Sequence, residues 1–132
     1  MSMCGIIGFV GNEDCVNYLL DGLSILENRG YDSAGIATLA DDAGMVISKY
    51  ASRSASSADA ISRLREEAAR HVNHTTGIGH TRWATHGAKT DQNAHPHTDY
   101  KQRVSVVHNG VIENYADLKK KLTAKGISFL SE

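Results

Sequence analysis

The sequence predicts a fold that mixes helices and strands, of the α+β or α/β class, within at most one domain. Its 132 residues fit the usual size of a single domain. Apolar residues make up 41% and charged residues 22%, which is ordinary globular usage and argues against wholesale disorder. Short apolar runs alternate with segments of helical spacing, which gives four or more strands and three helices.

The first half of the chain predicts a strand, a helix and a β-hairpin. Residues 3–10 are a short apolar run typical of a buried strand. A helix then opens at Asn12 and Asp14 and ends at the cation and glycine of Arg29 and Gly30. Strands over 33–40 and 45–50 flank a turn at 41–44, so the two strands are expected to pair. The apolar face of the helix consists of Val16, Leu19, Leu20, Leu23 and Leu26.

The middle of the chain predicts a loop over 51–57, a helix over 58–72 and a brief strand over 77–81. Residues 82–102 then form a long, polar, irregular segment that holds the single tryptophan and the single proline. Irregular segments of this length are uncommon in compact domains and are usually functional. The buried face of the helix is expected to consist of Ile61, Leu64, Ala68 and Val72.

The last third predicts a strand over 104–108, a tight turn at Asn109 and Gly110, a helix and a final strand over 127–130. Asn114 is a candidate helix cap, and Gly126 a candidate helix end. Leu118 and Leu122 supply the apolar stripe of this helix. The final strand has no partner after it in the sequence, so the chain is interpreted as the front portion of a larger domain.

Charge and hydropathy exclude several classes of protein. Fourteen Lys+Arg against fifteen Asp+Glu give a net charge of −1, without the basic excess of a nucleic-acid or anionic-membrane binder. No apolar run approaches the ~18 residues that span a bilayer, and no signal peptide is evident. The chain is therefore expected to be soluble, intracellular and cytoplasmic. Two cysteines, Cys4 and Cys15, are too few for a disulfide scaffold.

Cys4 has two interpretations. It is a small buried strand residue, or it is a nucleophile whose thiolate a nearby base generates. A free α-amino group on the same residue would be such a base, because it titrates near ~7.7–8.0. Cys15 lies within the first predicted helix and is interpreted as a packing residue.

The segment after the strand over 77–81 contains a candidate carboxylate site. Arg82 at a strand end can hold a carboxylate in a two-pronged grip, and Thr85 and His86 can add hydrogen bonds. The alternative is that Arg82 pairs with an acidic residue on the surface.

The histidines could suggest a metal site, but the spacing does not support one. There is neither a C-x-x-C pair nor an H-E-x-x-H motif. His95 and His97 flank Pro96 in what should be extended chain, which would point their rings apart. We therefore predict no metal and no cofactor, and expect structural histidines bonded to backbone. The other imidazoles considered are those of His80, His86 and His108.

Asn109 and Gly110 also have two interpretations, which are compatible. Asn-Gly between apolar runs is the strongest short-range hairpin signal. The same pair can also present a side-chain amide and a backbone N–H as two convergent neutral donors, which is the composition of an oxyanion hole.

Five motifs appear in an order that resembles one known family. They are MCGIIG (residues 3–8), NRGYDSAG (28–35), GHTRWATHG (79–87), NAHPH (93–97) and HNGVIEN (108–114). This pattern closely resembles the N-terminal glutaminase domain of the glucosamine-6-phosphate synthase family, the isomerising glutamine–fructose-6-phosphate aminotransferases. These are class II glutamine amidotransferases with the N-terminal-nucleophile (Ntn) hydrolase fold, a four-layer αββα sandwich. The resemblance covers nearly all of the chain but about half of that domain, and none of the sugar-isomerase domains.

The resemblance implies roles for individual residues. Cys4 would attack the side-chain amide of L-glutamine, and Asn109 with the Gly110 N–H would hold the oxyanion. Ammonia would leave for fructose 6-phosphate on the missing isomerase domains, and water would hydrolyse the glutamyl thioester. The resemblance also implies that Arg82 would bind the substrate carboxylate, with Thr85 and His86 assisting. Trp83 would lie on the mobile loop that closes over glutamine, and His95 would belong to the binding site. Arg29 would support the surroundings of the nucleophile.

The chain departs from the family pattern at both ends. Met1-Ser2-Met3 precedes Cys4, where one methionine is usual. Either Met1 and Ser2 are foreign to the natural chain, or further processing exposes Cys4, or the base is absent. The family's T-D-T-E run would follow Glu132, and its Asp pairs with the substrate ammonium. We therefore expect weak activity or none from this chain alone.

Exposed strand edges favour a homodimer or higher oligomer. The alternative functions are a non-catalytic glutamine-binding module and another class II glutaminase.

Overall fold

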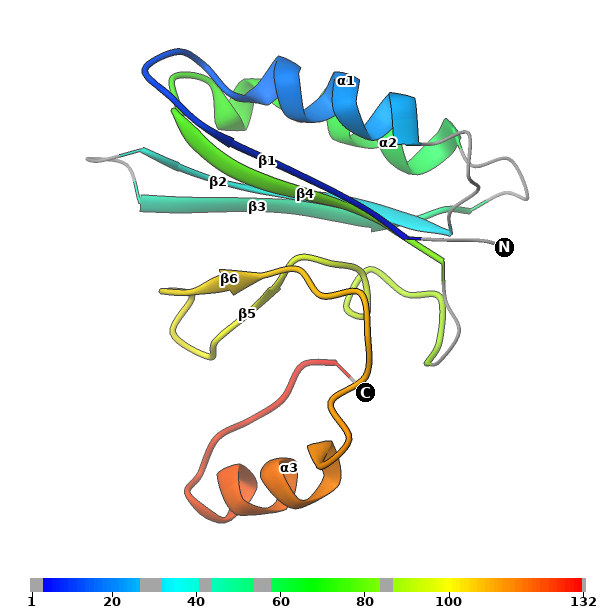
Figure 1. Ribbon diagram of the computed structural model, residues 1–132, viewed down its shortest axis with the longest axis vertical. Helices are drawn as coiled ribbons and strands as arrows, with labels where there is room; N and C mark the ends of the chain where they lie inside the picture. Colours follow the sequence, from blue (N-terminus) through cyan, green and yellow to red (C-terminus); the bar gives the residue numbers. More distant parts are fainter. Residues whose placement is uncertain (1–3, 27–31, 41–43, 54–57, 84–86, 132) are drawn as a thin grey trace.

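Four antiparallel strands form the main sheet of the computed structural model, which describes residues 4–26, 32–40, 44–53, 58–83 and 87–131 (Figure 1). The strand order is β1-β4-β2-β3, so β4 lies in the centre between two strands that precede it in the chain. Strands β2 and β3 pair along eight residues each, which confirms the predicted hairpin. The bounds are β1 Gly5–Val10, β2 Ser33–Ala40, β3 Gly44–Ala51 and β4 Thr76–Arg82.

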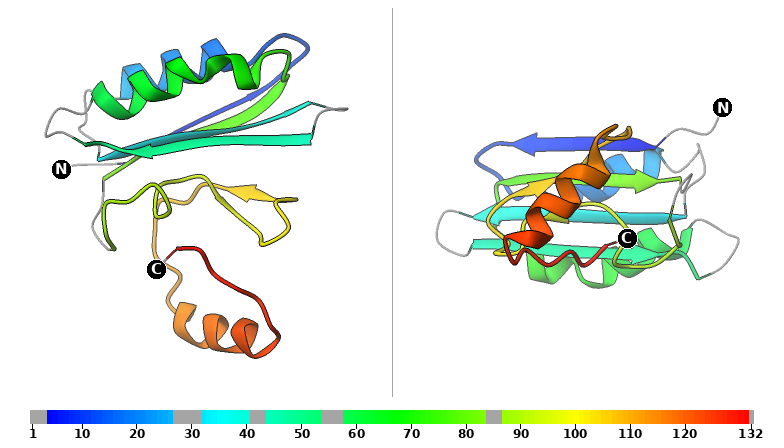
Figure 2. Two further views of the ribbon diagram at one scale, coloured as in Figure 1. Left: turned by 180° about the vertical axis from the view of Figure 1, so that it is seen from behind. Right: turned by 90° about the horizontal axis from the view of Figure 1, so that it is seen from below.

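Two helices, α1 (Val16–Leu26) and α2 (Ala58–Glu66), cover one face of this sheet (Figures 1 and 2). The Asp14 carboxylate accepts a hydrogen bond from the backbone N–H of Val16 at 2.9 Å, which caps the start of α1 as predicted. The predicted end of this helix at Arg29 and Gly30 lies outside the described residues. The core between helices and sheet consists of Cys15, Val16, Leu19, Leu20, Leu23, Ala34, Ile36, Ala60, Ile61 and Leu64.

The helix predicted over 58–72 is divided in two, which corrects one predicted core residue. Helix α2 ends at Glu66, and a 3-10 turn, η2 (Ala68–His71), follows it. A 3-10 turn has three residues per turn rather than 3.6, so the later side chains rotate relative to the α-helical pattern. Val72 is consequently 48% exposed instead of buried, and His71 is fully buried.

A directed chain of hydrogen bonds links η2 to strands β2 and β3. Ser48 donates its single proton to the Glu67 carboxylate at 2.7 Å, so it accepts from the Nε2–H of His71 at 2.9 Å. The Nδ1 atom of His71 is then an acceptor for the Thr38 hydroxyl at 2.7 Å. Thr38 in turn accepts from the Nδ1–H of His74, also at 2.7 Å. Because Nδ1 of His71 accepts a hydrogen bond, it carries no hydrogen, and the ring of His71 is therefore neutral.

Acidification from pH 8 to pH 5 is expected to narrow the stability difference between the wild type and a His71→Gln variant. Burial, together with the nearby Arg70 charge, lowers the pKa of His71 to about 4. Below pH ~6.5 the unfolded chain binds a proton that the folded chain refuses, so folded-state stability falls as pH falls. Glutamine at this position takes up no proton.

Urea unfolding of both proteins at pH 8 and pH 5 measures this effect. The difference in free energy of unfolding should be about 2 kcal/mol smaller at pH 5. The Glu67 carboxylate does not interfere, because its pKa is lowered to about 2 and its titration lies below this window. A difference that stays constant across the two pH values would contradict a neutral, buried His71.

The opposite face of the sheet carries a short hairpin, β5 (His97–Thr98) with β6 (Ser105–Val106), and helix α3 (Tyr115–Ala124) lies beyond it (Figures 1 and 2). The strand predicted over 104–108 is thus shorter than expected. The segment 127–130, predicted as a strand, is irregular. Neither segment finds a longer strand to pair with among the described residues, and strands need such a partner to satisfy their backbone groups.

Helix α3 forms where predicted, but its apolar stripe is not buried. Leu118 and Leu122 remain 40% and 39% exposed. Asn114 occupies the N-cap position without a side-chain capping bond, and Gly126 ends the helix with a φ of 82°. None of the described helices combines the length and apolar character that crossing a membrane requires.

Candidate active site

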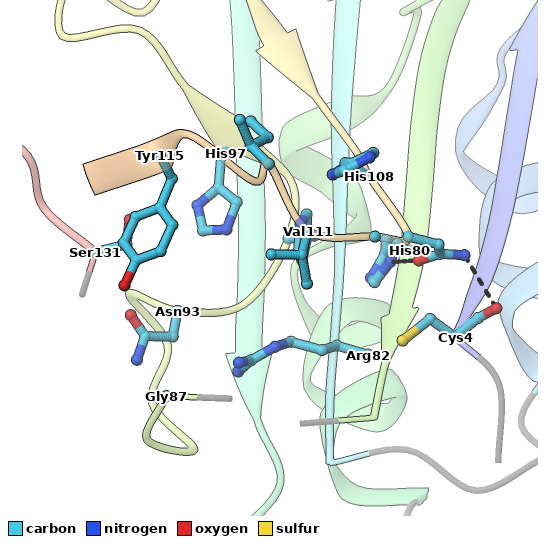
Figure 3. A pocket seen from close by; sticks show the side chains of 14 residues that line it. Cys4, His80, Arg82, Gly87, Asn93, His97, His108, Val111, Tyr115 and Ser131 are labelled. Atoms are coloured by element: carbon cyan, nitrogen blue, oxygen red, sulfur yellow. Dashed lines mark hydrogen bonds between the residues drawn. The ribbon is translucent and has the colours of Figure 1, made fainter. Parts of the chain in front are cut away.

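A pocket of about 520 Å³ lies where β1 begins and β4 ends, beneath the segment that follows β6 (Figure 3). The elements around it come from four distant parts of the sequence. Its lining is formed by Cys4, His80, Arg82, Gly87, Asn93, His95, His97, His108, Asn109, Gly110, Val111, Ile112, Tyr115 and Ser131. The pocket therefore brings together five of the nine site residues that the sequence predicts: Cys4, Arg82, His95, Asn109 and Gly110.

Cys4 stands directly before β1 and is half-buried. Its backbone is fixed by the strand that follows, because Gly5 donates its N–H to the Thr81 hydroxyl on β4 at 3.1 Å. The Trp83 N–H donates to the Cys4 sulfur at 3.2 Å, and the thiol lies 3.7 Å from the Trp83 carbonyl oxygen. The sulfur is thus held at the pocket by the backbone of residue 83, and is not packed into the apolar core.

Asn109 connects the last segment of the pocket to the first strand. Its Nδ2 donates to the Cys4 carbonyl at 3.1 Å, and its Oδ1 lies 2.7 Å from Nε2 of His80. The predicted hairpin at Asn109 and Gly110 is wrong, because β6 pairs with β5 and not with residues 111–112. The two side-chain bonds hold these residues as an open corner over the pocket.

His80 is the main residue of the site for which sequence analysis predicted no role beyond that of a possible metal ligand. It lies on β4 two positions before Arg82, so both side chains point to the same face of the strand. It is 1% exposed, and its ring lies 4.3 Å from that of His95. An imidazole two residues before a candidate carboxylate-binding arginine on one strand is the signal that could have found it.

Three of the imidazoles that line the pocket, those of His80, His95 and His97, are neutral near pH 7. Burial lowers the pKa of His80, and the Arg82 charge adds to this effect while the hydrogen bond to Asn109 opposes it. Burial, together with neighbouring imidazoles, Arg82 and Lys49, lowers the pKa of His95 to about 3 and that of His97 to about 4. The pocket thus combines a permanent guanidinium charge with uncharged donors and acceptors.

Arg82, at the end of β4, extends its side chain across the pocket (Figure 3). One of its guanidinium nitrogens lies 3.5 Å from the Ala88 carbonyl oxygen. Trp83 follows it and is 44% exposed, with its backbone rather than its ring at the cysteine. The other predicted site residues, Arg29, Thr85 and His86, lie outside the described residues.

His95 and His97 do not point apart as predicted. The chain bends at Pro96, across a cis peptide bond, and the two rings lie 4.3 Å from each other. Within the described ranges, no group of three His, Cys, Asp or Glu side chains is arranged to hold a metal ion. Sequence reasoning also missed Asn93, which is 6% exposed and donates to the Ala88 carbonyl at 3.0 Å.

The arrangement has the parts that acyl transfer from an amide requires. A half-buried thiol lies at the rim, an amide donor and a backbone N–H lie at one corner, and a guanidinium lies across the pocket. A thiol can serve as nucleophile, neutral donors can stabilise a developing oxyanion, and a guanidinium can bind a carboxylate.

Comparison with known proteins agrees with this composition. The sequence model of a family described as "Glutamine amidotransferase domain" matches residues 43–132. The glutamine–fructose-6-phosphate aminotransferases (isomerizing) of Oceanobacillus iheyensis and Mycolicibacterium paratuberculosis are 51% and 46% identical to this chain over 130 residues. The corresponding protein of Synechocystis is 49% identical over 131 residues.

These matches cover 98% of this chain and 20% of each of the three relatives. The chain therefore spans about a fifth of the length of the curated relatives it matches. The family model, by contrast, covers more than half of the chain. The chain belongs to the glutamine amidotransferase domain family.

Proposed function

We propose that this chain carries the glutaminase centre of an isomerising glutamine–fructose-6-phosphate aminotransferase, with Cys4 as its nucleophile. The observation that carries the proposal is the single pocket shared by the Cys4 thiol, the Asn109–Gly110 corner and the Arg82 guanidinium. The relatives' names and the family match support the same reaction.

The first step forms a bond between the Cys4 sulfur and the side-chain amide carbon of glutamine. The thiol proton passes to a base, and the carbonyl electrons move onto oxygen to give a tetrahedral oxyanion. An amide nitrogen carries two hydrogens, so Nδ2 of Asn109 can keep the Cys4 carbonyl with one and offer the other to the oxyanion. The Gly110 N–H is the second donor.

The second step breaks the carbon–nitrogen bond. The base returns its proton to the leaving nitrogen, ammonia departs, and a glutamyl thioester remains on Cys4. Water then attacks the thioester, releasing glutamate and the free thiol. Arg82 would hold the α-carboxylate throughout, assisted by Thr85, His86 and His95, with Trp83 closing over the substrate. Arg29 would support the surroundings of the nucleophile.

The proposed base is the α-amino group of Cys4, which exists only when residues 1–3 are removed. The amide nitrogen of an internal Cys4 is not basic, whereas a free α-amine titrates near ~7.7–8.0 and can accept the thiol proton at working pH. The active form is therefore proposed to begin at Cys4.

The fold supports placing this chain in an Ntn-type αββα sandwich. Helices α1 and α2, the main sheet, the β5–β6 hairpin and helix α3 follow one another as layers in that order (Figure 1). In this proposal the chain is the N-terminal part of the glutaminase domain, and fructose 6-phosphate binds to isomerase domains outside it. The outer edges of β1 and β3 in the described sheet support assembly into a homodimer or higher oligomer.

An electrophilic glutamine analogue is expected to label Cys4 alone. Cys15 is a matched internal control, because it is a thiol of the same chain with no exposed surface, and burial raises its pKa. Peptide mapping by mass spectrometry locates the adduct and reads the N-terminal residue in the same sample.

The labelled molecules should begin at Cys4, and excess glutamine should protect them. A Cys4→Ser variant should take no label. If the complete protein, including the isomerase domains that this proposal places outside the chain, hydrolyses glutamine while Cys4 stays unlabelled, the proposed nucleophile is wrong. If it neither hydrolyses glutamine nor takes the label, the enzymatic proposal fails and a binding module is the better description.

A further inference from the structure

The amide of Asn109 is held by two partners of opposite kind. The Cys4 carbonyl oxygen has no hydrogen, so the Asn109 atom 3.1 Å from it must be the nitrogen. The oxygen of the same amide then faces Nε2 of His80 at 2.7 Å. An amide oxygen accepts only, so the Nε2 of His80 must carry the hydrogen. The contact thus determines both the orientation of Asn109 and the tautomer of His80.

Two such bonds fix the plane of the amide and leave one hydrogen unused. Oδ1 takes the His80 hydrogen, and one hydrogen of Nδ2 goes to the Cys4 carbonyl. The two N–H bonds of a planar amide diverge by about 120°, so the second must point away from that carbonyl. Asn109 itself is exposed and lines the pocket. Its remaining hydrogen is therefore available to an atom bound there.

His80 is suited to hold this orientation because it is buried and its backbone is paired on both sides. It is 1% exposed on the central strand β4, packed against the ring of His95 at 4.3 Å between centroids. Its backbone pairs with Ile6 of β1 on one side and Gly35 of β2 on the other. Its Nδ1 is buried and has no hydrogen-bond partner among the described residues, which agrees with a neutral ring protonated at Nε2.

We propose that His80 is a positioning residue of the glutaminase reaction: its Nε2–H holds the Asn109 amide so that one amide hydrogen faces the oxyanion. The inference rests on the proposed function. It adds a residue whose effect on the reaction passes through Asn109. Oriented donors act without rearranging as charge develops, which is the source of their effect on rate.

Two substitutions of His80 separate its two nitrogens. A glutamine side chain carries an N–H near the position of imidazole Nε2, whereas an asparagine carries one near Nδ1. His80→Asn is therefore expected to lower kcat by ~10–100-fold, the usual cost of losing an orienting partner. His80→Gln should recover most of that loss. The KM for glutamine should change little in either variant, because the oxyanion forms only in the transition state.

A double-mutant cycle in the intact protein tests whether His80 acts through Asn109. In an Asn109→Ala background, His80→Asn should lower kcat by no more than about twofold, because the group that it orients is already gone. Thermal unfolding identifies folded variants. If His80→Asn does not fold, the same cycle with His80→Gln is used, and its smaller cost should likewise vanish in the Asn109→Ala background.

The outcomes separate this inference from the function on which it rests. An active wild type in which the His80 substitution lowers kcat by the same factor with and without Asn109 would overturn the positioning role alone. Equal losses of kcat in the His80→Gln and His80→Asn variants would also overturn it. A wild type that neither hydrolyses glutamine nor takes the label at Cys4 would overturn the proposed function.

Discussion

Replacing Asn109 with alanine is expected to lower the kcat of glutamine hydrolysis by ~10²–10³, the usual cost of removing one oxyanion donor. The variant loses the Asn109 side-chain donor and keeps the Gly110 N–H. Because the lost hydrogen bond belongs to the transition state, KM for glutamine should change far less than kcat. Steady-state release of ammonia or glutamate measures both constants.

Asn114→Ala is the matched control for this substitution. Asn114 is the same residue type five positions later, at the start of α3, and its side chain makes no capping bond. Its replacement should leave kcat unchanged and alter stability by no more than ~0.5 kcal/mol. Label uptake at Cys4 should persist in both variants, since the thiol itself is intact. Hydrolysis by Asn109→Ala at the wild-type rate would remove Asn109 from the oxyanion role.

Local sequence patterns were sufficient to predict a helix or strand where that element depends mainly on its own residues. Strands β1, β2 and β3 and helix α1 follow from apolar runs, apolar spacing and the Asp14 cap, and they form close to where these patterns predict. Helix α2 shows the limit of such patterns. Its change to η2 accompanies the burial of His71 against Thr38 and Ser48, partners that local periodicity does not reveal.

The Asn109–Gly110 corner shows the same limit at the candidate site. The dipeptide favours a hairpin locally, but its asparagine is bound by His80 and Cys4, which lie 29 and 105 residues away in the sequence. Residue type and motif marked Cys4, Arg82 and Asn109 as candidates, and the structure places all three at one pocket. The proposed role of His80 could not be predicted in this way, because it depends on one contact between strand β4 and the segment after β6, which are far apart in the sequence.

Gly35→Ala is expected to damage both the fold and the pocket. Gly35 lies on β2 between Lys49 of β3 and His80 of β4. A Cβ at this position would overlap the His95 carbonyl oxygen and would lie 2.6 Å from the Lys49 Cβ. The first neighbour is backbone and the second is the root of a side chain, so neither can move aside cheaply.

The loop that carries His95 is held down at this point. The Lys49 ammonium donates to the carbonyl oxygens of Gln92 and Ala94, at 3.1 Å and 2.8 Å, and the glycine leaves room for the His95 carbonyl beside them. An added methyl group should lift the loop from the sheet, which would move His95 away from the ring of His80. Overpacking of this kind costs about 1–3 kcal/mol.

Urea unfolding and glutaminase kinetics together test this prediction. Gly35→Ala should lower the free energy of unfolding by about 1–3 kcal/mol. It should also lower kcat by on the order of 10²-fold, the effect of a displacement near 1 Å at a reacting centre. Gly8→Ala is the matched control on β1, where an added Cβ would have its nearest neighbour at 3.9 Å. That variant should be neutral or up to ~1 kcal/mol more stable, because alanine is less costly than glycine within a strand. Equal stability and equal kcat in the two variants would mean that the loop does not depend on the space left at Gly35.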